Sequence, residues 1–309
     1  MAFSVLRNNS HNGTVGLDID GRLVAAVQAV DGRIVKAASS ELPAGLVTEG
    51  EVVDVAGLAS ALKEFTRHAG LPRNVRLGVA NRQIVMRLIE LPLIEDAAER
   101  DAAVRFQASE AIAMPLDEAV MDFDVVGYQE SQDGGQRMHV VVVAARQSMV
   151  EAVAEAARGA GLRPEGIDLD AFALVRMLAE ETEAQDQARL YCHLGGVTNL
   201  AIAIGKTCLF SRPLSTAWDA QNAVDTLADE IRLSLDYYMA QPNALPAGEL
   251  VLSGPGSQDD ELVSGLGGRL RLEMVAAPPL GRLDSSALAP GEDPRRYTVA
   301  AGLALGAAA

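Results

Sequence analysis

The sequence predicts a two-lobed α/β fold in which the second lobe repeats the first, with a small α+β unit inserted between them. One order of strands, tight turns and a helix occurs near the beginning of the chain and again in its second half. A complete strand–helix pattern separates these two copies. Apolar residues make up 49% of the 309 residues, which is enough to fill more than one core.

The first copy begins with three strands joined by tight turns. The pairs Asp20-Gly21 and Asp31-Gly32 lie between apolar runs, and Asp-Gly is typical of two-residue hairpin turns. A helix follows, which Asp54 can cap and which Gly70 and Pro72 end. The strands of this copy are expected at residues 14–19, 23–30, 34–40 and 75–80.

The second copy repeats this order. Turns at Gly195-Gly196 and Gly205-Lys206 separate its first three strands, and a long amphipathic helix stops at Gln241-Pro242. Its strands are expected at residues 190–194, 200–204, 208–212 and 249–253. The apolar stripe of the helix consists of Val224, Leu227, Ile231, Leu235 and Tyr238.

The segment between the copies predicts a self-contained α+β unit. It has one strand, a helix capped by Asp96, two more strands and a second helix that begins near Ser148. The chain is therefore expected to divide into a disordered lead at 1–13, a first lobe at 14–80 and 165–186, an inserted subdomain at 81–164 and a second lobe at 187–309.

Charge and composition argue against several classes of protein. The chain has 26 basic and 42 acidic residues, a net charge of -16, and such a chain repels phosphate backbones, so we expect no nucleic-acid partner. No apolar run approaches the roughly 20 residues that span a bilayer, so we expect no direct membrane insertion. Cys192, Cys208 and the four histidines are scattered, which argues against disulfides and zinc sites and favours a cytoplasmic protein.

Three glycine-containing turns form a candidate binding site, at residues 16–21, 193–199 and 253–256. A tight turn after a buried strand exposes backbone N–H groups, and two such turns that face each other can hold a chain of phosphates between them. Polar side chains at the strand ends can then place a metal ion. The three turns in this order predict a nucleotide cleft.

Four stretches carry a resemblance to a known family: residues 16–19, 90–92 with 110–115, 230–238, and 252–254 with 299–305. Together they resemble the actin-like ATPase superfamily, and more closely the PilM family of type IV pilus assembly. The helix around Asp236-Tyr237-Tyr238 is the most specific piece. The resemblance implies an actin-like (ribonuclease H-like) duplicated two-lobed fold with an inserted α+β subdomain.

The resemblance also implies ligands and partners. The ligand would be ATP with Mg²⁺, and Asp18 would hold the metal. The partner would be the cytoplasmic tail of the inner-membrane protein PilN, which the inserted subdomain captures at the periphery of the pilus inner-membrane platform; a homo-oligomer stays open. The nucleotide candidates are Asp18, Asp20, Gly21, Gly195, Gly196, Thr198, Asn199, Glu230, Gly254 and Gly256. The candidates for the partner groove are Ile84, Met86, Leu88 and Phe106.

Four departures from the family pattern touch the nucleotide cleft. Asp20 stands where glycine is usual and would repel phosphates. His193 stands where an aspartate usually helps to hold the metal, and a neutral imidazole holds Mg²⁺ poorly. Gly254-Pro255 replaces a glycine pair, and residues 212–224 are shorter than the family's helical stretch. We therefore expect a cytoplasmic scaffold with a degenerate or weak ATP site rather than an enzyme.

Several alternatives stay open at this point. An active ATPase or a sugar-kinase-like phosphotransferase would use the same fold, but His193 in place of the metal aspartate argues against both. A GspL-like secretion component usually continues into a transmembrane helix, and a division protein of the FtsA type ends in a membrane helix. Thr198 and Asn199 can simply shape their hairpin, and Glu230 with Arg232 can be a solvated charge pair.

Overall fold

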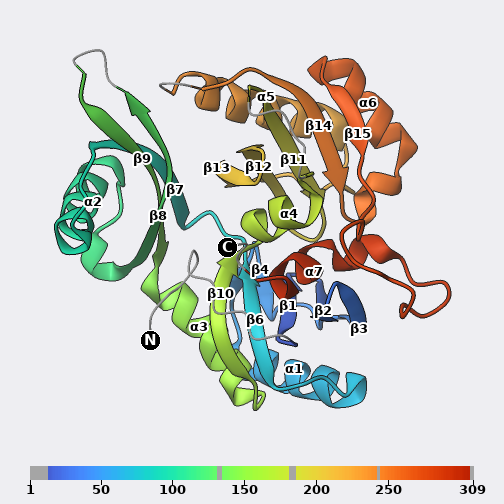
Figure 1. The fold of residues 1–309 in the computed structure, drawn as a ribbon. Coiled ribbons are helices and arrows are strands. Elements are labelled where there is room, and N and C mark those ends of the chain that lie inside the picture. Colours follow the sequence, from blue (N-terminus) through green and yellow to red (C-terminus); the bar gives the residue numbers. More distant parts are fainter. Residues whose placement is uncertain (1–12, 131–133, 181–185, 242–243, 307–309) are drawn as a thin grey trace.

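The computed structural model describes residues 13–130, 134–180, 186–241 and 244–306. The predicted disordered lead at 1–13 lies, except for Gly13, outside the described residues. Figure 1 shows two α/β lobes, one above the other, and a smaller unit beside them. No helix among the described residues is long and apolar enough to cross a membrane.

The first lobe is built on a five-stranded mixed sheet in the order β10-β6-β1-β2-β3. Tight turns join the first three strands into an antiparallel meander, and both Asp31 and Gly32 have positive φ, as a type I′ hairpin turn requires. The strands are β1 (Val15–Asp20), β2 (Leu23–Val30), β3 (Arg33–Glu41), β6 (Asn74–Val79) and β10 (Arg163–Leu169). A short hairpin of β4 (Val47–Thr48) and β5 (Glu51–Val52) lies outside this sheet.

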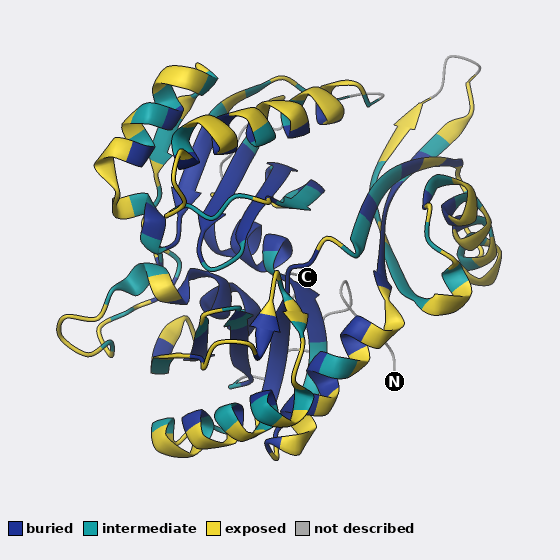
Figure 2. Ribbon diagram, turned by 180° about the vertical axis from the view of Figure 1, so that it is seen from behind, coloured by how far each residue is buried: buried dark blue, intermediate teal, exposed yellow. Residues whose placement is uncertain are grey.

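Helix α1 (Val55–Ala69) covers one face of the first sheet. The Asp54 carboxylate caps it by accepting the N–H of Gly57, and Gly70 ends it in the left-handed conformation, as the sequence predicts. Leu58, Leu62 and Phe65 point into the core of the lobe. Figure 2 shows the resulting pattern: the central strands of the two lobes are buried, and the covering helices are exposed on their outer side.

The second lobe has a sheet of the same topology, in the order β13-β12-β11-β14-β15. Each strand has its counterpart in the first sheet, so the predicted duplicated α/β fold is confirmed. The strands are β11 (Ala188–Leu194), β12 (Thr198–Ile204), β13 (Thr207–Pro213), β14 (Ala247–Ser253) and β15 (Glu273–Ala276). Helices α5 (Ala223–Met239) and α6 (Asp260–Leu270) pack together beside this sheet.

The smaller unit is an antiparallel sheet in the order β7-β9-β8. Helix α2 (Ala97–Ala111) covers one face, where Val104 and Ala108 contact the strands in a separate apolar cluster. The Asp96 carboxylate caps this helix, as predicted. The strands are β7 (Ile84–Pro92), β8 (Ala119–Glu130) and β9 (Gln136–Arg146), and a short 3₁₀ helix, η1 (Leu116–Glu118), precedes β8.

Two helices pack on the first lobe, although the predicted boundaries assign them to other parts of the chain. Helix α3 (Gln147–Gly159), expected within the subdomain at 81–164, lies against α1 and contributes its apolar face to the core of the first lobe. Helix α7 (Thr298–Ala304), expected in the second lobe at 187–309, follows η3 (Pro294–Tyr297) and lies against β1 of the first lobe. In both helices, apolar residues join the core of the first lobe, most of whose other members lie far away in the sequence.

A layer of two helices separates the lobes. Helix α4 (Asp170–Leu178) contacts β12 and β13 of the second lobe, and α7 contacts β1, β2 and β6 of the first. The two helices contact each other at Gly302, where a Cβ atom would lie 2.0 Å from the carbonyl oxygen of Ala173. Gly16 is equally crowded, since a Cβ there would lie 2.0 Å from the carbonyl oxygen of Ala300. Glycine at these two positions permits the close packing.

Candidate functional site

The β1–β2 turn of the first lobe and the β11–β12 turn of the second lobe touch each other. The Asp20 carboxylate, at the end of β1, accepts hydrogen bonds from the backbone N–H groups of Gly196 and Val197, each at 2.5 Å. The predicted nucleotide candidates Asp20, Gly195 and Gly196 are therefore brought together. The sequence predicts the two turns and their opposition, but the direct bond between them was not foreseen.

The glycines of the second turn make this contact possible. A Cβ atom on Gly196 would lie 2.0 Å from the carbonyl oxygen of Asp20, and one on Gly195 would lie 2.5 Å from its carboxylate. Gly21, beside Asp20, has φ +65° and open space where a side chain would lie, so it serves the turn geometry. An ion pair between Arg22 and Asp219, at 3.1 Å, also joins the two lobes.

Buried carboxyl groups gather beside this contact between the lobes. Burial raises the pKa of Asp18 well above its usual value, and the carboxylates of Asp170 and Asp20 raise it further. The pKa of Asp170 is raised by burial first, and then by Asp20 and Asp168. Burial also raises the pKa of Asp20 to about 6, although the hydrogen bonds that its carboxylate accepts from the N–H groups of Gly196 and Val197 oppose this shift. Asp168 differs from these three, since it forms a buried ion pair with Arg176 at 3.0 Å.

Several buried oxygen atoms of this region have no hydrogen-bond partner among the described residues. They are one carboxylate oxygen each of Asp18 and Asp170, the hydroxyl of Thr198 and the amide oxygen of Asn199. Buried polar atoms are normally hydrogen-bonded, so unpartnered ones need an explanation. Sequence reasoning missed Asp170; its position directly after a strand and at the start of a helix is the signal that could have found it.

The residues present fit a magnesium ion only in part. Asp18 and Asp170 offer hard carboxylate oxygens, the donor type that Mg²⁺ prefers, and Mg²⁺ is commonly held by one or two carboxylates plus substrate phosphates. Among the described residues, no group of three or more His, Cys, Asp or Glu side chains could hold a metal by itself. A metal here would therefore depend on a bound nucleotide for its remaining ligands.

His193 takes no part in this acidic cluster. Its Nδ1 atom lies 2.9 Å from the hydroxyl of Ser253, and burial lowers its pKa to about 4. The imidazole is therefore neutral near pH 7 and held by a neighbouring strand. It supplies neither a carboxylate for a metal nor a positive charge for a phosphate.

The third turn is covered by a side chain from the short connection before α5. Gly254 has φ +83°, and η2 (Pro255–Gln258) follows it. At Gly256 a Cβ atom would lie 2.6 Å from the indole of Trp218, so the ring rests directly on this turn. The Glu230 carboxylate accepts the N–H of Ser215 at 2.6 Å and the hydroxyl of Thr216 at 2.9 Å. Glu230 thus holds the loop that carries Trp218; it is neither a solvated partner of Arg232 nor free for a ribose.

Comparison with known proteins decides the family. Residues 16–194, more than half of the chain, match the family model described as "Type IV pilus assembly protein PilM". The chain belongs to the PilM family. A solved PilM–PilN type IV pilus biogenesis complex is similar at 27% identity with a TM-score of 0.79, over 95% of this chain and 98% of that one.

More distant structures show that the fold of this PilM-family chain is actin-like, as the resemblance implies. MreB5 of Spiroplasma citri, solved with ADP, has a TM-score of 0.55 at 11% identity, over 96% of both chains. The ethanolamine utilization protein EutJ from Carboxydothermus hydrogenoformans has a TM-score of 0.52 at 12% identity, over 98% of this chain and 93% of that one. At such identities the likeness concerns the fold alone.

The predicted partner groove of this PilM-family chain is not assembled as expected. Ile84, Met86 and Leu88 lie on the face of the β7 sheet that packs toward the core of the first lobe. Phe106 lies on α2, which covers the opposite face, and it is 68% exposed. The four residues therefore do not line one groove. The cavity next to Ile84 and Met86 measures about 10 Å³, which is room for one water molecule.

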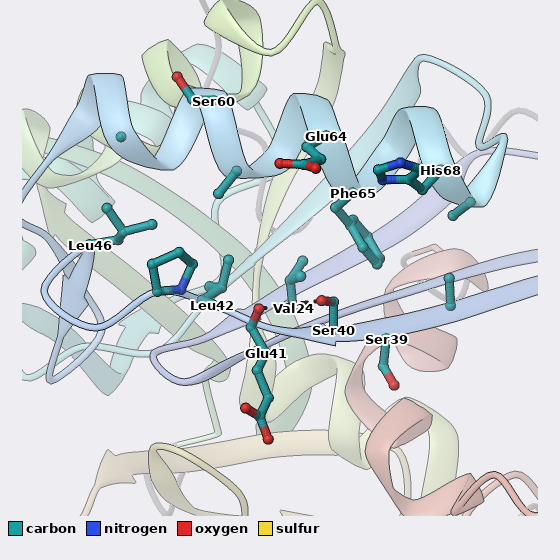
Figure 3. A pocket seen from close by; sticks show the side chains of 15 residues that line it. Val24, Ser39, Ser40, Glu41, Leu42, Leu46, Ser60, Glu64, Phe65 and His68 are labelled. Carbon is teal, nitrogen blue, oxygen red and sulfur yellow. Dashed lines mark hydrogen bonds between the residues drawn. The ribbon is translucent and has the colours of Figure 1, made fainter.

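Two larger hollows lie elsewhere. One, of about 240 Å³, lies between β8, α3 and β10, where the inserted sheet meets the first lobe. The other, of about 740 Å³, lies between α1 and the end of β3. Figure 3 shows the second hollow, with Ser60, Glu64 and His68 along the helix and Leu42 and Leu46 on the loop opposite. The first of the two hollows adjoins the inserted unit, as the predicted partner groove should.

Proposed function

We propose that this chain is a cytoplasmic scaffold of type IV pilus assembly that binds the N-terminal tail of the inner-membrane protein PilN. The similarity to the solved PilM–PilN complex carries the proposal, because it extends over 95% of this chain at 27% identity. Binding of PilN would hold the scaffold at the periphery of the inner-membrane platform.

The hollow between β8, α3 and β10 suits such a tail better than the residues first expected. Strand β10 is an edge strand of the first-lobe sheet, and β8 is an edge strand of the inserted sheet. Edge strands present unpaired N–H and C=O groups, to which an extended peptide can add. Val120, Ala154 and Ile167 supply apolar contacts in the hollow, and Gln147 lies exposed at its rim.

Titration calorimetry with a peptide copied from the N-terminal tail of the PilN of the same organism tests the site. We expect micromolar or tighter binding. Val120→Glu places a charge among the apolar contacts and should weaken binding at least tenfold, or about 1.4 kcal/mol. Gln147→Trp, at an exposed position, should obstruct the hollow without disturbing the core.

Phe106→Glu is the matched control, because this exposed side chain lies on the other side of the inserted sheet. Its affinity for the peptide should equal that of the wild type. If Phe106→Glu loses binding while Val120→Glu and Gln147→Trp bind normally, the hollow between β8, α3 and β10 is not the binding site. A wild-type chain that does not bind the peptide would reject the proposed function itself.

The proposed ATP site is weak. Asp20 adds a carboxylate beside the backbone N–H groups that phosphates would use, and His193 is a neutral side chain hydrogen-bonded to Ser253. Asp18 and Asp170 still offer oxygens for Mg²⁺, so residual binding is compatible with the cleft. We expect weak or absent binding of a fluorescent ATP analogue with Mg²⁺, and no measurable turnover. Tight binding, or hydrolysis that depends on Asp18, would favour the active ATPase instead.

A further inference from the structure

The backbone N–H groups of Gly196 and Val197 form an anion site that already has an occupant. We infer that the Asp20 carboxylate stands in for a phosphate at this turn and thereby ties the two lobes together without nucleotide. The inference rests on the proposed degenerate nucleotide cleft and specifies how that cleft is regulated: a side chain of the protein fills it.

The geometry of the contact is that of anion recognition. Consecutive N–H groups converge on the two carboxylate oxygens, with Gly196 donating to Oδ2 and Val197 to Oδ1, each at 2.5 Å. Short bonds of this kind are typical of ionised acceptors. The donor and acceptor are far apart in the chain, by 176 and 177 positions, so the bond joins one lobe to the other.

The fit leaves no space for a second anion. The backbone of Gly196 approaches Asp20 so closely that even a methyl group would collide with the carbonyl oxygen of Asp20. Asp20 itself is only 9% exposed. A phosphate oxygen can reach these two N–H groups only after the carboxylate has left them.

Neighbouring contacts reinforce the same closure. The Arg22–Asp219 ion pair joins the two lobes at the rim of the cleft. Trp218, from the loop held by Glu230, covers the third turn at Gly256, where a nucleoside would rest. The protein thus places its own carboxylate at the phosphate turn and its own aromatic ring at the nucleoside turn.

Amide hydrogen exchange, measured residue by residue by NMR on the full chain without nucleotide, tests the inference. In the wild type the amides of Gly196 and Val197 should be protected. In Asp20→Gly they should exchange at least tenfold faster, and pyrophosphate with Mg²⁺ should restore their protection. The same pyrophosphate should leave the wild type unchanged. Asp31→Gly, in the turn at the other end of β2, is the matched control and should leave both amides protected.

Unprotected amides in the wild type, or unchanged exchange in Asp20→Gly, would overturn the inference. The inference would also be overturned if pyrophosphate protected the Gly196 and Val197 amides of the wild type as strongly as those of Asp20→Gly. If Asp20→Gly does not fold, Asp20→Asn replaces it: its single carbonyl acceptor should speed exchange at one of the two amides only. The exchange measurement needs neither PilN nor ATP. A failure of the proposed function, in PilN binding or in the predicted weakness of ATP binding, is therefore detected by separate experiments.

Discussion

Asp18 at the cleft end of β1 has Asp170, the first residue of α4, as a like-charged neighbour, and each keeps one carboxylate oxygen unpartnered among the described residues. Both are buried, so neither charge is well solvated by water. Two such carboxylates resist ionisation, and this resistance has a measurable effect on stability.

The effect of pH follows from the raised pKa values. A carboxyl group whose pKa is raised in the folded state contributes stability that is fully present below its unfolded pKa, near 4, and is lost as pH rises through the folded pKa. Asp18, Asp20 and Asp170 all shift upward, Asp20 to about 6, so the loss extends from about pH 4 to above pH 6. His193 acts in the opposite direction, because burial lowers its pKa to about 4: its contribution to stability grows as pH rises from about 4 to the unfolded value near 6.5, and it offsets part of the loss.

We therefore predict that Asp18→Asn stabilises the protein at pH 7.5, by on the order of 1–3 kcal/mol, and has little effect near pH 4. The amide keeps the shape of the side chain but removes one buried charge. Urea unfolding at a series of pH values measures the difference. A variant that is less stable than the wild type at pH 7.5 would show that the Asp18 charge is compensated in the fold.

The contact between α7 and α4 depends on the absence of a side chain at Gly302. Gly302→Ala should lower the free energy of unfolding by about 1–3 kcal/mol, because the new methyl group must push α7 away from Ala173. The matched control is Gly268→Ala in α6, where a Cβ atom meets nothing within 4 Å. Alanine there should be neutral or stabilising by up to about 1 kcal/mol, from helix propensity. Equal effects of the two changes in urea unfolding would contradict the packing argument.

The fluorescence of Trp218 reports the loop over the third turn, because it is the one tryptophan of the chain. Glu230→Ala removes the acceptor for Ser215 and Thr216 and should release this loop. We expect emission shifted to longer wavelength and stronger quenching by acrylamide. Asp236→Ala, at an exposed position of the same helix, should leave both unchanged. An unaltered spectrum in Glu230→Ala would mean that other contacts hold the ring.

Restoring the family residues should restore ligand binding. The double variant Asp20→Gly with His193→Asp frees the two N–H groups of the second turn and returns a carboxylate to the metal position. We expect affinity for a fluorescent ATP analogue with Mg²⁺ to rise at least tenfold, or about 1.4 kcal/mol. His193→Asp alone should gain less, because Asp20 still fills the turn. No gain in the double variant would locate the obstruction elsewhere, Trp218 being the first candidate.

The elements of the fold were predictable because their signals are local. Asp54 and Gly70 mark the ends of α1, and Asp31-Gly32 marks a hairpin, each by the conformation of a few adjacent residues. The repetition of one strand order then predicts the duplicated architecture. The packing of α3 and α7 was not predictable in this way, because an apolar helix face does not identify the surface that it will cover.

In the candidate site, too, local features were predictable and long-range contacts were not. The sequence places Asp20 at the phosphate turn and predicts interference with phosphates, but the bond to Gly196 joins residues 176 positions apart. No local pattern reveals such a bond. Phe106 and Met86 are both apolar residues of the inserted unit, yet Met86 faces the first lobe and Phe106 lies on the helix that covers the opposite face of the sheet.

The position of α7 has a consequence for biosynthesis. This helix, at residues 298–304, covers β1, which begins at Val15, so the first-lobe core stays incomplete until residue 304 has left the ribosome. Contacts between such distant segments raise the contact order and slow folding. During translation the nascent first sheet exposes the apolar surface that α7 later covers, and such surface is what chaperones bind.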